Sequence, residues 1–165
     1  MSIFNIRVYG LLINDNNEVL VTDEFRFGKE MTKFPGGGLQ WGEGTLDCLK
    51  REFKEELGCE IEILKHFYTT DFFQLSAFHH DQQIISIYYL VKTKNSSPTP
   101  ALPIGEGDKR QQAFPDGEDS RLPGGQVGGA SSQSFRWISI AEINENDFTF
   151  PIDKKVAGML RNHKF

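Results

Sequence analysis

Short runs of apolar and β-branched residues occupy the start of the chain, a pattern typical of β-strands. One run covers residues 3–13 and another covers 18–23, and the sequence Asn-Asp-Asn-Asn between them is typical of a turn. The pattern predicts a β-hairpin. The polar segment that follows ends in a proline and three glycines at 35–38, where we expect irregular backbone.

A helical period begins at residue 45. Apolar residues recur there at spacings of three and four, and all fall in one narrow stripe of a helix: Leu46, Leu49, Phe53 and Leu57. Gly58 follows, and glycine is common just past the end of a helix. We therefore expect a helix over 45–57 that packs through these four side chains.

Further along the chain, alternating or apolar runs predict more strands and a second helix. The expected strands are residues 59–64, 66–73, 84–92 and 135–140, and the expected helix is 151–162, with a short helix or turn before it. The run at 84–92 is the more apolar of the middle two, which places it near the centre of a sheet. Strands mixed with helices predict an α/β domain.

Residues 95–134 interrupt this pattern, because they hold five of the seven prolines and seven of the sixteen glycines. Such a segment buries too little apolar surface to offset the entropy lost on ordering. About thirty residues follow it, too few for a second core. We therefore predict a single domain over 1–165 with a disordered insertion.

Charge and cysteine content limit the class of protein. Eighteen basic and twenty-three acidic residues give a net charge of -5, so no general attraction to nucleic acid or to an anionic membrane is expected. Cys48 and Cys59 lack metal-ligand spacing and are expected to be free thiols of a reducing compartment. The first residues resemble neither a signal peptide nor a membrane span, so a cytoplasmic protein is expected.

Three glutamates lie off the apolar stripe of the predicted helix: Glu52, Glu55 and Glu56. Glu52 and Glu56 form a like-charge pair at i and i+4, and Glu56 lies near the negative end of the helix dipole, so both features oppose helix stability. A hard divalent cation such as Mg²⁺ would make this arrangement favourable. A solvated acidic face is the alternative that the helix alone leaves open.

The glycines and one more glutamate extend this cluster into a longer pattern. Gly37, Glu43, Arg51-Glu52-Phe53, Glu55-Glu56 and Gly58-Cys59 resemble the Nudix box in type and spacing, over 23 of the 165 residues. Phe53 and Cys59 stand where that family usually has an aliphatic residue, which alters packing rather than chemistry. The resemblance implies a Nudix-type α/β/α sandwich with a mixed β-sheet. It also implies an Mg²⁺- or Mn²⁺-dependent hydrolase that cleaves a pyrophosphate bond in a nucleoside diphosphate linked to another moiety.

By the same resemblance, Glu52, Glu55, Glu56 and the Gly36 carbonyl are expected metal ligands, with Arg51 and Glu43 as orienting residues. Glu52 is the first candidate for the general base. Some relatives supply a further acidic residue from the loop before the late strand, where residues 127–134 carry none. The alternatives are a base from the insertion (Asp116, Glu118 or Asp119) and impaired catalysis.

Substrate contacts are predicted less directly. The candidate phosphate contacts are Arg7, Arg26, Lys29 and Lys33, and the aromatic residues that could stack on a nucleobase are Tyr68, Phe72, Phe73 and Phe78. Ordinary surface charge and core packing are the alternatives for each set. The expected partner is a small-molecule nucleotide, and a homodimer is a candidate assembly. A Nudix-fold module that binds or senses a nucleotide without cleaving it is the alternative function.

Overall fold

The computed structural model describes residues 3–26, 28–94 and 132–164, although the side chain of residue 26 is not among the described parts. Its elements in chain order are β1 (Ile3–Leu12), β2 (Glu18–Arg26), β3 (Lys29–Lys33), β4 (Gly36–Gly38), α1 (Thr45–Leu57), β5 (Ile61–Thr69), β6 (Gln82–Thr93), β7 (Ser132–Ser139), the 3-10 helix η1 (Glu145–Asp147) and α2 (Pro151–Arg161). The predicted insertion at 95–134 lies outside the described residues, except for its last three, which belong to β7. None of the described helices is long and apolar enough to cross a membrane.

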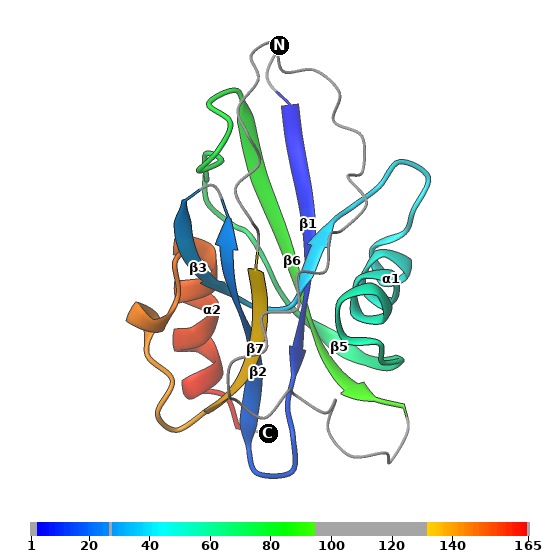
Figure 1. Ribbon diagram of the computed structural model, residues 1–165, viewed down its shortest axis with the longest axis vertical. Helices are drawn as coiled ribbons and strands as arrows, with labels where there is room; N and C mark the ends of the chain where they lie inside the picture. Colours follow the sequence, from blue (N-terminus) through cyan, green and yellow to red (C-terminus); the bar gives the residue numbers. More distant parts are fainter. Residues whose placement is uncertain (1–2, 27, 95–131, 165) are drawn as a thin grey trace.

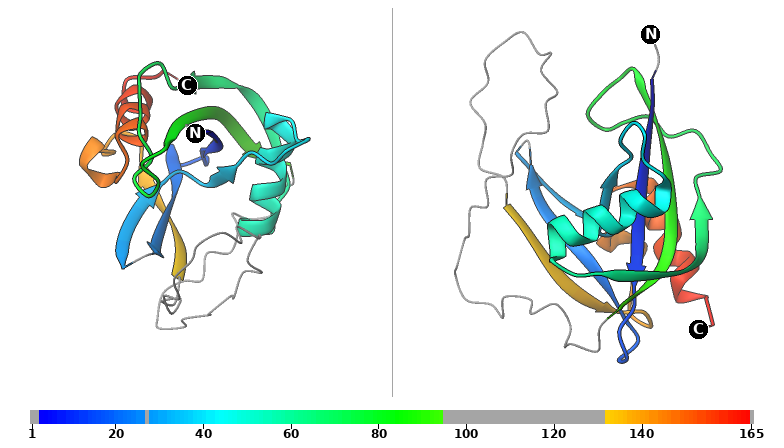
Figure 2. Two further views of the ribbon diagram at one scale, coloured as in Figure 1. Left: turned by 90° about the horizontal axis from the view of Figure 1, so that it is seen from above. Right: turned by 90° about the vertical axis from the view of Figure 1, so that its right-hand side faces the viewer.

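Two β-sheets lie between the two α-helices (Figures 1 and 2). One sheet has the strand order β4-β1-β6-β5, and the other has the order β3-β2-β7. β1 and β6 pair in parallel while the other pairs are antiparallel, so the four-stranded sheet is mixed. The expected α/β/α sandwich with a mixed sheet is therefore confirmed, and β6 has neighbours on both sides, as its apolar sequence predicted.

The hydrophobic core has two parts, one against each helix. Helix α1 buries Leu49 and Phe53 among Val8, Leu12 and Val91 of the four-stranded sheet. The second part lies between the sheets and α2, and its members include Phe34, Tyr88, Val156 and Leu160. Residues of both sheets contribute to this second part, so α2 packs against a core that both sheets share.

The predicted packing face of α1 is partly wrong. The helix has the expected bounds and ends at Gly58 in the left-handed conformation, at φ 63°. Its buried side chains are Cys48, Leu49 and Phe53, whereas Leu46 is 43% exposed. The helix is therefore rotated toward Cys48, which is small enough to approach the sheet and replaces Leu46 in the interface.

Several strand predictions also need correction. β1 and β2 belong to different sheets and are joined by the single bridge between Ile13 and Val19, so they do not form a hairpin ladder. The two strands expected at 59–64 and 66–73 are one strand, β5, which has two register shifts against β6. The polar segment at 29–33 forms β3, because pairing with β2 satisfies its backbone despite its polar side chains.

Candidate active site

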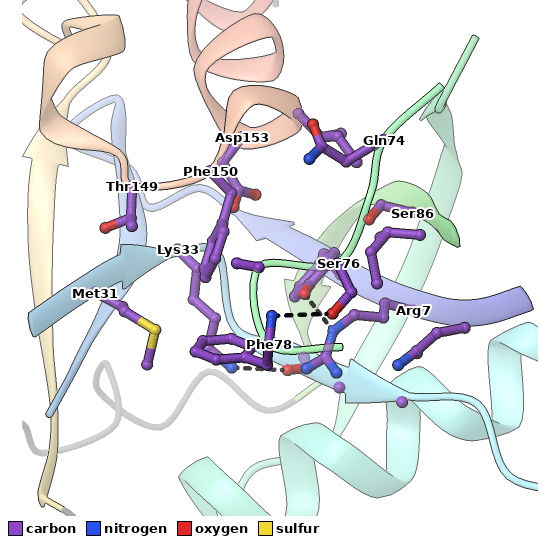
Figure 3. A pocket seen from close by; sticks show the side chains of 18 of the residues that line it. Arg7, Met31, Lys33, Gln74, Ser76, Phe78, Ser86, Thr149, Phe150 and Asp153 are labelled. Carbon is purple, nitrogen blue, oxygen red and sulfur yellow. Dashed lines mark hydrogen bonds between the residues drawn. The ribbon is translucent and has the colours of Figure 1, made fainter. Parts of the chain in front are cut away.

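A pocket of about 600 Å³ opens where both sheets, α1 and the start of α2 come together (Figure 3). Its walls include β1, β3, β4 and β6, together with the loop of residues 74–79. Two of the predicted metal-binding glutamates, Glu52 and Glu56, line it with all three glycines of β4. The sequence motif and this pocket therefore coincide.

The glycine triplet is a short strand rather than the irregular segment expected from its composition, because it pairs with residues 7–9 of β1. At Gly36, φ is 135° and an added Cβ would lie 2.2 Å from the carbonyl oxygen of Val8. At Gly37, an added Cβ would lie 2.3 Å from Oε1 of Glu52. Position 36 requires glycine because of its φ and its contact with the β1 backbone, whereas a side chain at position 37 would displace the Glu52 carboxylate.

Arg51 organises the acidic side chains of the motif. Its guanidinium donates to Glu43 at 2.8 Å, to Glu52 at 2.8 Å and to Glu55 at 3.0 Å, and also to the carbonyl oxygen of Gly38 at 3.2 Å. The hydrogen bond from Arg51 is the main reason that the pKa of Glu43 falls to about 2. The expected orienting pair, Arg51 and Glu43, thus fixes α1 to the loop before it.

Glu52 and Glu56 differ in how their charge is balanced. Glu52 is held by Arg51, whereas Oε2 of Glu56 is buried without a hydrogen-bond partner among the described residues. Burial raises the pKa of Glu56, the Lys33 charge and a hydrogen bond from Gln133 oppose that shift, and the Glu52 charge adds to it. An unpartnered buried carboxylate oxygen is costly unless a ligand satisfies it.

Comparison with known proteins identifies the family. A model described as the NUDIX domain matches residues 4–157. The chain belongs to the Nudix family. No curated protein sequence matches it significantly.

Solved structures agree with this fold at low sequence identity. A MutT protein from Methanosarcina mazei Go1 is 16% identical with a TM-score of 0.62, covering 99% of this chain and 98% of its own. A NUDIX hydrolase from Nitrosomonas europaea is 17% identical with a TM-score of 0.61, covering 96% and 88%. An ADP-ribose pyrophosphatase from Streptococcus suis is 14% identical with a TM-score of 0.53, covering 94% and 86%.

The Nudix box of this chain suits a divalent cation in its donor chemistry. No group of three or more acidic, histidine or cysteine side chains within the described ranges is close enough to make a ready-formed metal site. Mg²⁺ commonly takes only one or two carboxylates and fills its shell with water and substrate phosphate, however. That requirement is matched by Oε2 of Glu56, which has no hydrogen-bond partner in the described part of the chain, by the neighbouring Glu52, and by the Gly36 carbonyl, which accepts a 3.4 Å hydrogen bond from Lys33.

The remaining predicted site residues divide between the pocket and its surroundings. Glu55 is bonded to Arg51, its side chain is 58% exposed, and it is not part of the pocket lining. Lys33 is buried in the pocket but forms an ion pair with Glu24 at 2.8 Å. Lys29 is exposed at the rim, and the side chain of Arg26 lies outside the described parts. Of the aromatic candidates, Phe78 lines the pocket, Tyr68 is buried in the core, and Phe72 and Phe73 are exposed and outside the lining.

Sequence reasoning missed a buried polar network behind the box. The Tyr88 hydroxyl donates to Asp153 at 2.8 Å, and both residues line the pocket floor. Burial raises the pKa of Asp153 to about 7, against the opposing hydrogen bond from Tyr88. An acidic residue in the first turn of a helix looks like an ordinary dipole partner in the sequence, so no local signal marked Asp153 as buried.

Proposed function

We propose that this Nudix protein is a divalent-metal-dependent hydrolase that cleaves a pyrophosphate bond in a nucleoside diphosphate linked to another moiety. The observation that carries the proposal is the unpartnered buried oxygen of Glu56, which lies in the same pocket as Glu52 and the glycine strand. A partly buried acidic pair beside the glycine strand suits a cation, and a cation in a cleft of this size suits a phosphate ester or anhydride.

Each residue of the motif has a proposed role. Glu52, Glu56 and the Gly36 carbonyl would hold Mg²⁺ or Mn²⁺, with Glu55 as a further ligand once its side chain leaves Arg51. The bound cation would neutralise charge on the phosphates and lower the pKa of water. Arg51 and Glu43 keep Glu52 in position, and Glu52 is our candidate for the general base. The acids of the insertion, Asp116, Glu118 and Asp119, lie outside the described residues.

The substrate is proposed at the level of class. One structural neighbour is named an ADP-ribose pyrophosphatase and another a UDP-X diphosphatase, which favours nucleotides and nucleotide sugars. Phe78 at the pocket wall could stack on a base, and Lys29 and Lys33 remain candidate phosphate contacts. A cytoplasmic location and a homodimer stay predictions of the sequence.

A substrate screen tests this proposal. Nucleoside triphosphates, nucleotide sugars, ADP-ribose and dinucleoside polyphosphates are incubated with Mg²⁺, and the nucleoside phosphates released are separated and identified. Glu52→Gln is the matched control for contaminating activity. We expect turnover of at least one class by the wild type and its loss in the variant. Tight binding of one nucleotide without turnover of any would support the binding module instead.

A further inference from the structure

Arg7 is a pocket residue outside the Nudix box. It lies on β1 between Gly38 of β4 and Ser86 of β6 in the strand register, and it lines the pocket beside the glycine strand. Its Nε donates to the Tyr9 hydroxyl at 2.6 Å, and its guanidinium carbon lies 5.7 Å from the centre of the Tyr9 ring. These two contacts fix the plane of the guanidinium before any ligand binds.

Within the described residues, the two terminal nitrogens of Arg7 have no hydrogen-bond acceptor. Arg7 also forms no ion pair with any described carboxylate. Lys33, the other cation deep in the pocket, is already paired with Glu24. The charges of Glu24 and Glu52 act on Arg7, but its two terminal nitrogens remain available as donors deeper in the pocket than the exposed Lys29 at the rim. Unmet donors in a partly buried site favour a ligand that accepts hydrogen bonds.

Ser76 offers a second donor to the same pocket. Its Oγ accepts hydrogen bonds from the backbone N–H groups of Phe78 and His79, both at 3.2 Å, so its own hydroxyl hydrogen remains to be donated. The side chain is 6% exposed and lines the pocket. Figure 3 shows Arg7 and Ser76 both pointing into the cavity, from β1 and from the loop of residues 74–79.

We infer that Arg7 binds a phosphoryl group of the substrate, with Ser76 as a second donor, and is a specificity-determining residue for anionic nucleotides. A guanidinium fork matches two oxygens of a phosphoryl group, and the tetrahedral group keeps a further oxygen for a hydroxyl outside that plane. A planar carboxylate has no oxygen outside the plane of the fork, so a hydroxyl placed out of that plane is poorly oriented toward it. The inference rests on the proposed function, since it concerns the substrate of the same site.

Binding of methylenediphosphonate tests this assignment, because its P–C–P bridge resists hydrolysis. Calorimetry with saturating Mg²⁺ compares wild type, Arg7→Gln and Arg7→Lys, with Arg161→Gln at the exposed end of α2 as the matched control. Malonate is the carboxylate counterpart of the ligand. We expect Arg7→Gln to raise the Kd roughly 10- to 100-fold. Arg7→Lys, which keeps the charge without the fork, should give a smaller loss, and Arg161→Gln should change the Kd less than about twofold.

Three results would overturn the inference: equal binding by wild type and Arg7→Gln, an equal loss in Arg161→Gln, or malonate binding as tightly as methylenediphosphonate. If Arg7→Gln does not fold, Arg7→Lys is used in its place, and unchanged binding by that variant overturns the inference.

Failure of the proposed function would give different results. Arg7-dependent diphosphonate binding by a protein that hydrolyses no nucleotide would contradict the hydrolase alone. Hydrolysis with an unchanged KM in Arg7→Gln would contradict the role of Arg7 alone.

Discussion

A methyl group at Gly37 would lie 2.3 Å from Oε1 of Glu52. The strand backbone and the helix carboxylate therefore lie close together, and a side chain at position 37 would force the carboxylate to move. The absence of a side chain at position 37 allows Glu52 to point along β4 into the pocket while Arg51 holds it from the helix. The glycine and the glutamate of the motif depend on each other sterically.

Gly37→Ala should reduce turnover at least about tenfold, because Glu52 must move away from its position beside Arg51. Steady-state kinetics on the substrate found in the screen measures the effect. Gly38→Ala is the comparison, since an added Cβ there would meet nothing within 4 Å. An equal loss in both variants would show that the close contact with Glu52 is not the cause.

Glu56→Gln should lower turnover about 100-fold or more while leaving the protein as stable as the wild type, or more so, in the absence of metal. Burial raises the pKa of Glu56, so its charge is unfavourable without a cation, and glutamine removes that charge while keeping the shape. Turnover and urea unfolding in EDTA test the two parts of the prediction. Lys54→Gln, an exposed change on the same helix, should affect neither. A loss of stability in Glu56→Gln without metal would contradict the proposal that Glu56 is a metal ligand whose charge is uncompensated in the metal-free protein.

Asp153 should make stability depend on pH in a defined direction. Its pKa is about 7 in the folded protein and near 3.8 otherwise, so the folded state holds the extra proton between these values. Stability from this group is complete below pH 3.8 and is lost as pH rises through 7. The carboxyl faces Tyr88, Lys33 and Arg7, whose opposing effects are already contained in this pKa, and the stability lost over this pH range is on the order of 4 kcal/mol.

Asp153→Asn removes this titration and keeps an acceptor for Tyr88. Urea unfolding midpoints of the two proteins are compared from pH 4 to pH 8. The midpoint of the variant should rise relative to that of the wild type up to about pH 7, and the two curves should run parallel above it. Parallel curves over the whole range would mean that Asp153 does not carry a raised pKa.

Phe53→Ala should destabilise the protein by about 3–5 kcal/mol, because its ring is fully buried and fills the space beside Gly10. Leu46→Ala on the same helix should cost less than about 1 kcal/mol, since Leu46 is exposed. Chemical denaturation of both variants measures the difference. Similar losses of stability would show that Leu46 packs in the core, as the sequence predicted.

The sequence was sufficient to predict those parts of the fold that depend on interactions between residues close together in the chain. The bounds of α1 followed from its apolar period and from Gly58, which adopts the left-handed conformation just past the helix. The motif itself was also visible, because its residues lie within one helix and the loop before it. The exposed Leu46 was missed because helix rotation depends on how closely the sheet approaches Cys48, and the helix sequence does not contain that information.

Long-range pairing explains the other differences. Lys33 pairs with Glu24 across two strands, and Tyr88 meets Asp153 from an element 65 residues away. Neither pair has a sequence spacing that marks it. β3 and β4 became strands because β2 and β1 offered backbone partners, although their own side chains are polar or absent.

The dependence of turnover on Mg²⁺ concentration shows whether Glu56 holds a catalytic cation. Wild type and Glu56→Gln are assayed with the substrate found in the screen, from EDTA to saturating Mg²⁺. We expect no turnover in EDTA, saturable activation of the wild type, and a Mg²⁺ midpoint for Glu56→Gln raised roughly 10- to 100-fold. Turnover that persists in EDTA, or the same midpoint in both proteins, would contradict a catalytic cation held by Glu56.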